Sequence, residues 1–136
     1  MNGDLDTLLC AALERCGEGV AAAYLFGSVA RGDDRPASDV DVAVLFEEDP
    51  PSRLESLPVD LHDALQTMAG RPVDLVVLNG APADLAHRVL RDGRLILDRN
   101  RSRRIAFEVR TRNEYFDLLP VLRRYRRQAP AAPASR

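Results

Sequence analysis

The stretch "YLFGSVARGDDRPASDVDVAVLF", residues 24–46, joins two apolar runs through a Gly-Ser turn and a polar loop. Its second run, residues 39–46, has the composition of a buried strand but begins with two aspartates. Side chains two residues apart in a strand point to the same face, about 7 Å apart along the chain. Asp39 and Asp41 therefore point together, and the same face continues with the apolar Ala43 and Leu45, so it is not simply a solvated face.

Two carboxylates on a partly buried face repel each other and lose hydration, and a divalent cation between them relieves both costs. Mg²⁺ is usually held by one or two carboxylates together with substrate phosphates. Asp74 interrupts a third apolar run, residues 71–79, and joins the pair if the two strands are neighbours. For any one of these aspartates alone, the better interpretation is an edge strand with acidic residues toward solvent. The three together, beside a glycine turn, favour a metal site.

The Gly-Ser turn predicts an anion site. Gly27 directly follows a strand, and a glycine there lets the backbone approach a ligand closely. Ser28 is expected to cap a short helical turn that ends at Gly32, so that its hydroxyl and the nearby N–H groups face an anion. Arg31 adds positive charge. Gly-Ser after a strand is by itself an ordinary tight turn, but opposite the aspartates it predicts half of a nucleotide site.

The rest of the chain predicts an α/β domain in which helices cover a small sheet. Helices are expected at residues 4–16, 52–70, 83–91 and 99–127, and strands at 20–26, 39–46, 71–79 and 94–98. Pro58 is expected to split or delay the second helix, and Pro120 to bend or interrupt the last one. We expect one domain over residues 1–127, followed by a disordered tail at 128–136.

The composition, 46% hydrophobic and 29% charged over 136 residues, is typical of a single globular domain. The N-terminus lacks a secretory signal and no apolar run reaches membrane length, so we expect a cytoplasmic protein without membrane contact. Charge is unevenly distributed. Residues 1–98 hold eight arginines and 18 acidic residues, whereas residues 99–136 hold 11 arginines and three acidic residues.

The basic segment at residues 99–127 has three interpretations. The segment could pack on its own domain, contact an acidic partner protein, or bind RNA phosphates. Because the residues between the arginines are mostly aliphatic and offer few stacking platforms, a protein is favoured over RNA. The apolar stripe expected to make the contact comprises Ile105, Val109, Tyr115, Phe116 and Leu119.

Gly27-Ser28, ten further residues and then Asp39-Val40-Asp41 resemble the signature of the DNA polymerase beta-like nucleotidyltransferase superfamily. The surrounding sequence resembles its small stand-alone members, the minimal nucleotidyltransferases. Many of these are encoded beside a HEPN-domain protein and act as its antitoxin. The resemblance covers residues 20–98 and implies the fold of the superfamily, a small mixed sheet flanked by helices.

The resemblance also implies a mechanism. Asp39 and Asp41 would hold two Mg²⁺ ions against the triphosphate of ATP, and Asp74 would ligate one metal and help deprotonate the acceptor hydroxyl. The Gly-Ser turn, aided by Arg31, would hold the β- and γ-phosphates. For the antitoxin branch, the resemblance implies transfer of AMP to a tyrosine of the HEPN toxin within a hetero-oligomer.

Two alternatives remain open from the sequence. The same fold could neutralise its partner by binding alone, with catalysis absent. It could also transfer a nucleotide to a small molecule or an RNA end, although relatives of that kind usually carry a further domain that holds the acceptor. The three aspartates favour the enzyme over the pure binder, because binding alone has no need to concentrate carboxylates beside a phosphate turn.

Overall fold

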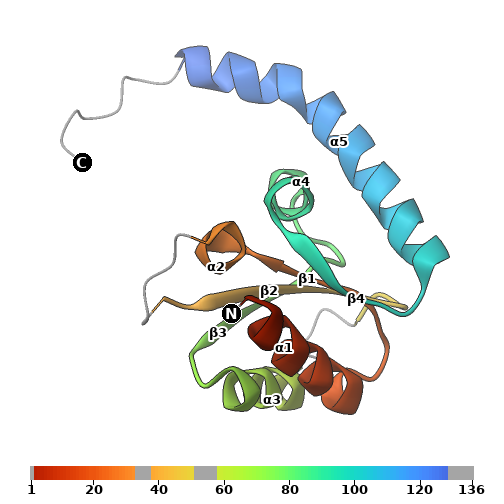
Figure 1. Ribbon diagram of the computed structural model, residues 1–136. Coiled ribbons are helices and arrows are strands. Elements are labelled where there is room, and N and C mark those ends of the chain that lie inside the picture. The colour runs from red at the N-terminus through yellow and green to blue at the C-terminus, as the bar shows by residue number, and fades with distance from the viewer. Residues whose placement is uncertain (1, 33–37, 51–57, 129–136) are drawn as a thin grey trace.

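The computed structural model describes residues 2–32, 38–50 and 58–128, which form five helices and a four-stranded sheet (Figure 1). In chain order the elements are α1 (Asn2–Cys16), β1 (Val20–Phe26), α2 (Gly27–Arg31), β2 (Val40–Phe46), α3 (Val59–Ala69), β3 (Val73–Val77), α4 (Ala83–Asp92), β4 (Arg94–Asp98) and α5 (Arg101–Gln128). The predicted order of helices and strands is confirmed. Pro58 delays α3, whose predicted first part at residues 52–57 lies outside the described residues.

The sheet is mixed, and its strand order is β3-β2-β1-β4. Strand β1 pairs antiparallel with both β2 and β4, whereas β2 and β3 run parallel. Helices α1 and α3 cover one face of the sheet, and α4 and α5 lie on the other (Figure 1). The predicted fold class, a small mixed sheet flanked by helices, is therefore confirmed.

Both faces of the two central strands are buried, which explains their continuous apolar runs. Val40, Val42 and Val44 pack with the leucines of α1 and α3. Ala43 and Leu45 point to the other face, where they pack beneath α4 and α5. The predicted alternation along β2 is confirmed, and it places the Asp-bearing face on the side of α4.

Side chains of α3 complete the hydrogen bonding of β3 at Val73. Nε2 of His62 lies 2.6 Å from the Val73 carbonyl oxygen. The Val73 N–H donates to Oε1 of Gln66 at 3.0 Å. Both backbone groups of this residue face away from β2, and both find a partner on the neighbouring helix.

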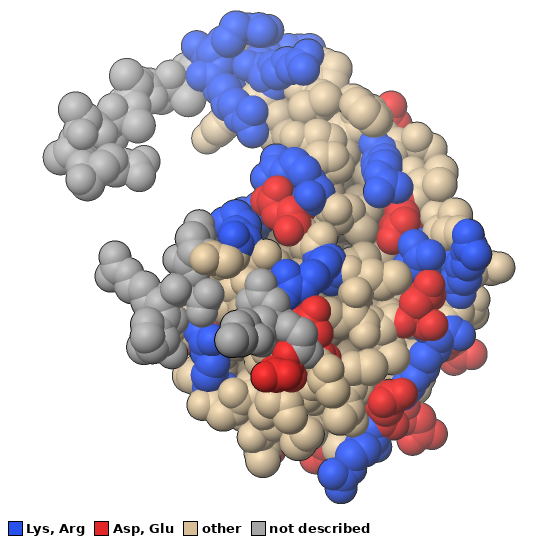
Figure 2. Space-filling view, in the orientation of Figure 1, with Lys and Arg blue, Asp and Glu red and all other residues tan. Residues whose placement is uncertain are grey.

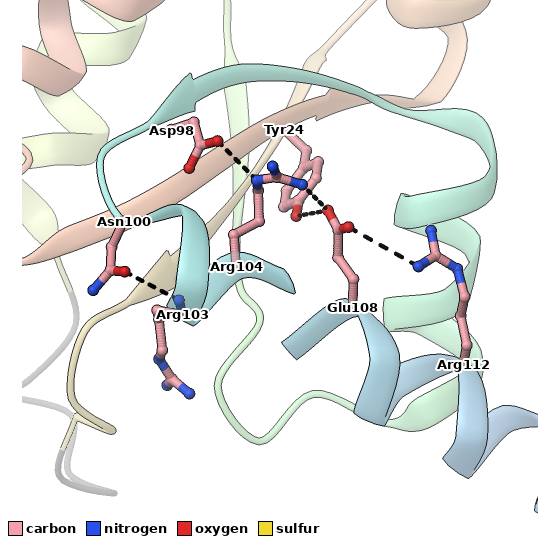
Figure 3. A network of polar contacts seen from close by, with 7 residues as sticks. All are labelled: Tyr24, Asp98, Asn100, Arg103, Arg104, Glu108 and Arg112. Atoms are coloured by element: carbon pink, nitrogen blue, oxygen red, sulfur yellow. Dashed lines mark hydrogen bonds and ion pairs between the residues drawn. The ribbon is translucent and has the colours of Figure 1, made fainter. Parts of the chain in front are cut away.

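The first turns of α5 are fixed to the sheet by a polar network (Figure 3). The hydroxyl of Tyr24 on β1 donates to Oε2 of Glu108 at 2.7 Å. Arg104 bridges this carboxylate, at 3.1 Å, and Asp98 of β4, at 2.9 Å. Burial and the hydrogen bond to Glu108 raise the pKa of Tyr24 above its ordinary value, so the phenol stays protonated and remains a donor.

Beyond this network, α5 contacts its own domain through a face that includes only part of the predicted stripe. Phe107 and Thr111 are buried. Tyr115 stacks on His87 of α4 with 3.7 Å between ring centroids. Of the predicted stripe, Ile105, Val109 and Phe116 are exposed by 40%, 50% and 63%. The own-domain alternative is therefore wrong for these three residues, because the contact with β1 and β4 uses another side of the helix. The predicted contact of the stripe with a partner protein stays a prediction.

Helix α5 continues through Pro120, so the predicted alternative of an interruption is wrong. The helix changes direction along its length and carries its far end beyond the sheet (Figure 1). The arginines of its last turns form a basic cluster there (Figure 2). Gln128, predicted as part of the tail, is the last residue of α5, and residues 129–136 lie outside the described part.

No helix in the described part of the chain combines the length and the apolar character needed to cross a bilayer.

Candidate functional site

A cavity of about 420 Å³ lies where β2 and β3 meet α2 and α4. Its lining combines three acidic residues, two arginines and an apolar rim, and comprises Phe26, Gly27, Arg31, Asp41, Asp74, Val76, Leu85, Arg88 and Asp92. Four of the six residues predicted for the site are in this lining. The other two, Ser28 and Asp39, are not.

The carboxylates of Asp41 and Asp74 come from neighbouring parallel strands. The two residues are paired directly in the β2–β3 register, which confirms the predicted adjacency of their strands. Asp39 precedes β2 by one residue and is exposed. The structure thus joins two aspartates at the cavity and leaves the third at the entrance to the strand.

Burial raises the pKa of Asp41, and the negative charges of Asp74 and Asp39 raise it further. Arg31 and Arg88 act in the opposite direction. The ionised form of Asp41 is therefore disfavoured in the protein alone, because its nearest acidic neighbours repel it and it has lost part of its hydration. A cation bound beside it would remove this penalty.

The donor set fits a hard divalent cation whose coordination is completed by a ligand. Within residues 2–32, 38–50 and 58–128, no three acidic, histidine or cysteine side chains converge into a finished metal site. Two adjacent carboxylates are nevertheless the protein share that Mg²⁺ commonly receives, with phosphate and water oxygens supplying the rest. Asp41 and Asp74 match that arrangement, and Asp39 lies close enough to influence Asp41 electrostatically.

Gly27 is required by its contact with Asp41. Its φ of 78° is in the left-handed region that favours glycine. A Cβ at this position would overlap Oδ2 of Asp41 and lie 2.9 Å from its Cγ. The turn after β1 is thus packed directly against the carboxylate of β2, which brings backbone N–H groups and a potential cation site together.

Ser28 does not cap α2 as predicted. The N-cap is Phe26, which makes no side-chain hydrogen bond, and Ser28 lies inside the first turn. The helix begins two residues earlier than a Ser28 cap implies, at Gly27. Its predicted end is confirmed, since Gly32 adopts φ 79° at the C-cap. Arg31, in the last turn of α2, lines the cavity.

The sequence prediction missed the contribution of α4. Arg88 and Asp92 are four residues apart and therefore lie on one side of this helix, and both line the cavity. A helix was predicted at this position, and the spacing of the two charges was visible. The side of the helix that faces the aspartates became clear only from the packing of Ala86 and Val89 on the sheet.

Comparisons with known proteins point to one family. The profile of the family described as "Polymerase beta, Nucleotidyltransferase" matches residues 12–102, which include the Gly-Ser turn and all three aspartates. The protein adenylyltransferase MntA of Thermococcus cleftensis is 39% identical over 74 residues, covering 54% of this chain and 72% of that protein.

Two of the similar solved structures match most of the chain. A crystal structure of a toxin-antitoxin with AMP-PNP matches with a TM-score of 0.70 and 26% identity, over 83% of this chain and 88% of that chain. The complex of a tri-AMPylated Shewanella oneidensis HEPN toxin with its MNT antitoxin matches with a TM-score of 0.67 and 24% identity, over 87% of this chain and 89% of that chain. The second likeness is one of fold.

Proposed function

The chain belongs to the polymerase beta nucleotidyltransferase family, and from this premise we propose that it is an antitoxin that AMPylates a HEPN-domain toxin. The observation that carries the proposal is the pairing of Asp41 with Asp74 in a cavity closed on one side by the Gly27 turn. This arrangement places carboxylates and backbone donors around one volume, as nucleotidyl transfer requires.

In the proposed reaction, a hydroxyl oxygen of the toxin attacks the α-phosphorus of ATP. The bond from that phosphorus to the bridging oxygen breaks, pyrophosphate leaves, and AMP remains on the toxin. Asp74 would receive the hydroxyl proton, while the turn at Gly27 and Ser28, with Arg31, would hold the β- and γ-phosphates. Asp39, Asp41 and Asp74 would hold Mg²⁺, which when bound stabilises negative charge on the attacking and leaving oxygens.

The toxin is the proposed acceptor because the related MntA is a protein adenylyltransferase and a related toxin-antitoxin structure contains AMP-PNP. The far half of α5 supports a protein partner over RNA. Phe116, Val121 and Tyr125 are exposed there by 63%, 54% and 72%. Exposed apolar side chains at this density are typical of a protein contact, whereas arginines alone would suffice for phosphate binding.

A label-transfer assay tests the proposal. Purified protein, Mg²⁺ and α-phosphate-labelled ATP are incubated with the HEPN protein encoded beside it, and label on the toxin is measured. The Asp39→Asn/Asp41→Asn double variant should transfer no label. Asp63→Asn, which removes an exposed carboxylate of α3 away from the cavity, should transfer at the wild-type rate.

The same assay separates catalysis from binding. A toxin that the double variant still inhibits without label would identify a binding antitoxin and refute the catalytic proposal. Chelation of divalent cations should stop transfer by the wild type.

A further inference from the structure

A second arginine of the cavity, Arg88 on α4, takes no part in the proposed reaction. It is exposed and lines the cavity together with Arg31, but it comes from a different helix. It makes no hydrogen bond or ion pair with the described residues. A guanidinium always carries its charge and has five N–H donors, so an unpaired one in a cavity is a ready anion ligand.

The position of Arg88 is fixed by the packing of α4. Ala86 and Val89, on either side of it in sequence, are buried against the sheet. The helix then ends at Gly93, where a Cβ would lie 2.9 Å from the carbonyl oxygen of Leu25 in β1. The end of α4 therefore rests directly on the central strand, and the backbone of Arg88 is held at the rim of the cavity while its side chain remains available.

The neighbouring Arg91 differs from Arg88 in this respect. Its Nε and Nη2 donate to both carboxylate oxygens of Asp92 at 2.8 and 2.9 Å. This bidentate pair occupies the guanidinium of Arg91 and holds the carboxylate of Asp92 beside it. Of the two arginines near the end of α4, Arg88 is thus the one free to bind a ligand.

A polyphosphate in this cavity needs positively charged side chains beside it. Asp41, Asp74 and Asp92 contribute three carboxylates to the lining, and a polyphosphate entering the cavity meets their repulsion. Arg88 and Arg31 both act on the carboxyl of Asp41, so both guanidinia lie within electrostatic reach of the site. Two guanidinium groups on separate helices can bind a polyphosphate from two sides.

We propose that Arg88 binds the β- and γ-phosphates of the nucleotide, so that Arg31 from α2 and Arg88 from α4 clamp the triphosphate between two helices. The inference rests on the proposed function, because it assumes a nucleoside triphosphate in the cavity. It adds a selection rule: Arg88 on α4, together with Arg31 on α2, favours triphosphates over monophosphates.

The test measures nucleotide affinity without the toxin. Dissociation constants for ATP, ADP and AMP are determined by calorimetry in Mg²⁺ for the wild type and for Arg88→Gln, Arg88→Lys and Arg110→Gln. Loss of a charge-assisted contact at an exposed position should weaken ATP binding about tenfold in Arg88→Gln. AMP binding should not change, and Arg88→Lys should fall between the wild type and Arg88→Gln.

Arg110→Gln is the matched control, because it removes one exposed arginine of α5 that does not line the cavity. It should bind all three nucleotides as the wild type does. If Arg88→Gln binds ATP like the wild type, or loses ATP and AMP affinity equally, the clamp is refuted. The proposed function has a separate outcome: it fails if the wild type neither binds ATP nor labels the toxin, whatever Arg88 does.

Discussion

The contact between Gly27 and Asp41 makes the substitution Gly27→Ala a sharp test of the site. The alanine must adopt φ near 78°, which costs roughly 1–2 kcal/mol for a residue with a Cβ. Its Cβ would also overlap the carboxylate of Asp41, and moving that side chain from its rotamer costs about 1 kcal/mol more. We therefore expect the free energy of unfolding to fall by about 2–3 kcal/mol and Tm by about 10 °C.

The effect on catalysis should exceed the effect on stability. Asp41 can avoid the new methyl group only by moving away from the cavity, and a displacement of about 1 Å at a reacting centre costs on the order of 100-fold in rate. Thermal unfolding followed by circular dichroism gives the first quantity, and initial rates of label transfer give the second, both measured below the unfolding transition.

Gly70→Ala is the matched control for this experiment. Gly70 at the end of α3 has φ 67°, but a Cβ there meets no atom within 4 Å. This variant should lose only the backbone cost of roughly 1–2 kcal/mol and retain full transfer. The reasoning is refuted if Gly27→Ala transfers label at the wild-type rate, or if Gly70→Ala loses as much transfer as Gly27→Ala. Either result would show that Gly27 is not needed to make room for the carboxylate of Asp41.

Three further substitutions test other parts of the structure. Asp41→Asn should abolish transfer yet raise Tm, because it removes a carboxylate that is disfavoured by burial and repulsion; a lower Tm in thermal unfolding would contradict this. Tyr24→Phe should lower the free energy of unfolding in urea by about 1 kcal/mol, since the hydrogen bond to Glu108 is lost. Burial and nearby arginines lower the pKa of His87 below 6.5, so the unfolded chain binds the proton more readily and stability should fall as pH decreases below about 6.5. His87→Phe, which keeps a ring against Tyr115, should lose this part of the pH dependence between pH 7.5 and 5.5 in the same urea titrations, and an unchanged dependence would exclude His87 as its source.

The central strands and the carboxylates were predictable because their sequence patterns are local. Asp41 was noticeable because it interrupts an apolar run that is buried on both faces, whereas Asp74 interrupts a shorter apolar run on the outer strand β3, where it is exposed. Their direct pairing depended on the order of strands in the sheet, which the sequence suggested but could not establish. The structure confirms that pairing.

The errors concern choices that are made by packing between distant segments. The face that α5 presents to its domain is set by the bonds of Glu108 and Arg104 to the sheet, and hydrophobicity along the helix does not reveal it. Ser28 was expected as a cap from its residue type, but the contact of Gly27 with the neighbouring strand places the helix start earlier. Arg88 was missed because the orientation of α4 follows from its burial against β1.

The bonds that α3 makes to Val73 also bear on how the molecule behaves at high concentration. β3 is the last strand on its side of the sheet, and an outer strand offers its free backbone groups to any other chain. His62 occupies the carbonyl of Val73 and Gln66 its N–H, as a further strand would. A second molecule consequently finds no partner at this residue, so intermolecular sheet extension, a route to aggregation, is disfavoured at the residue that precedes Asp74.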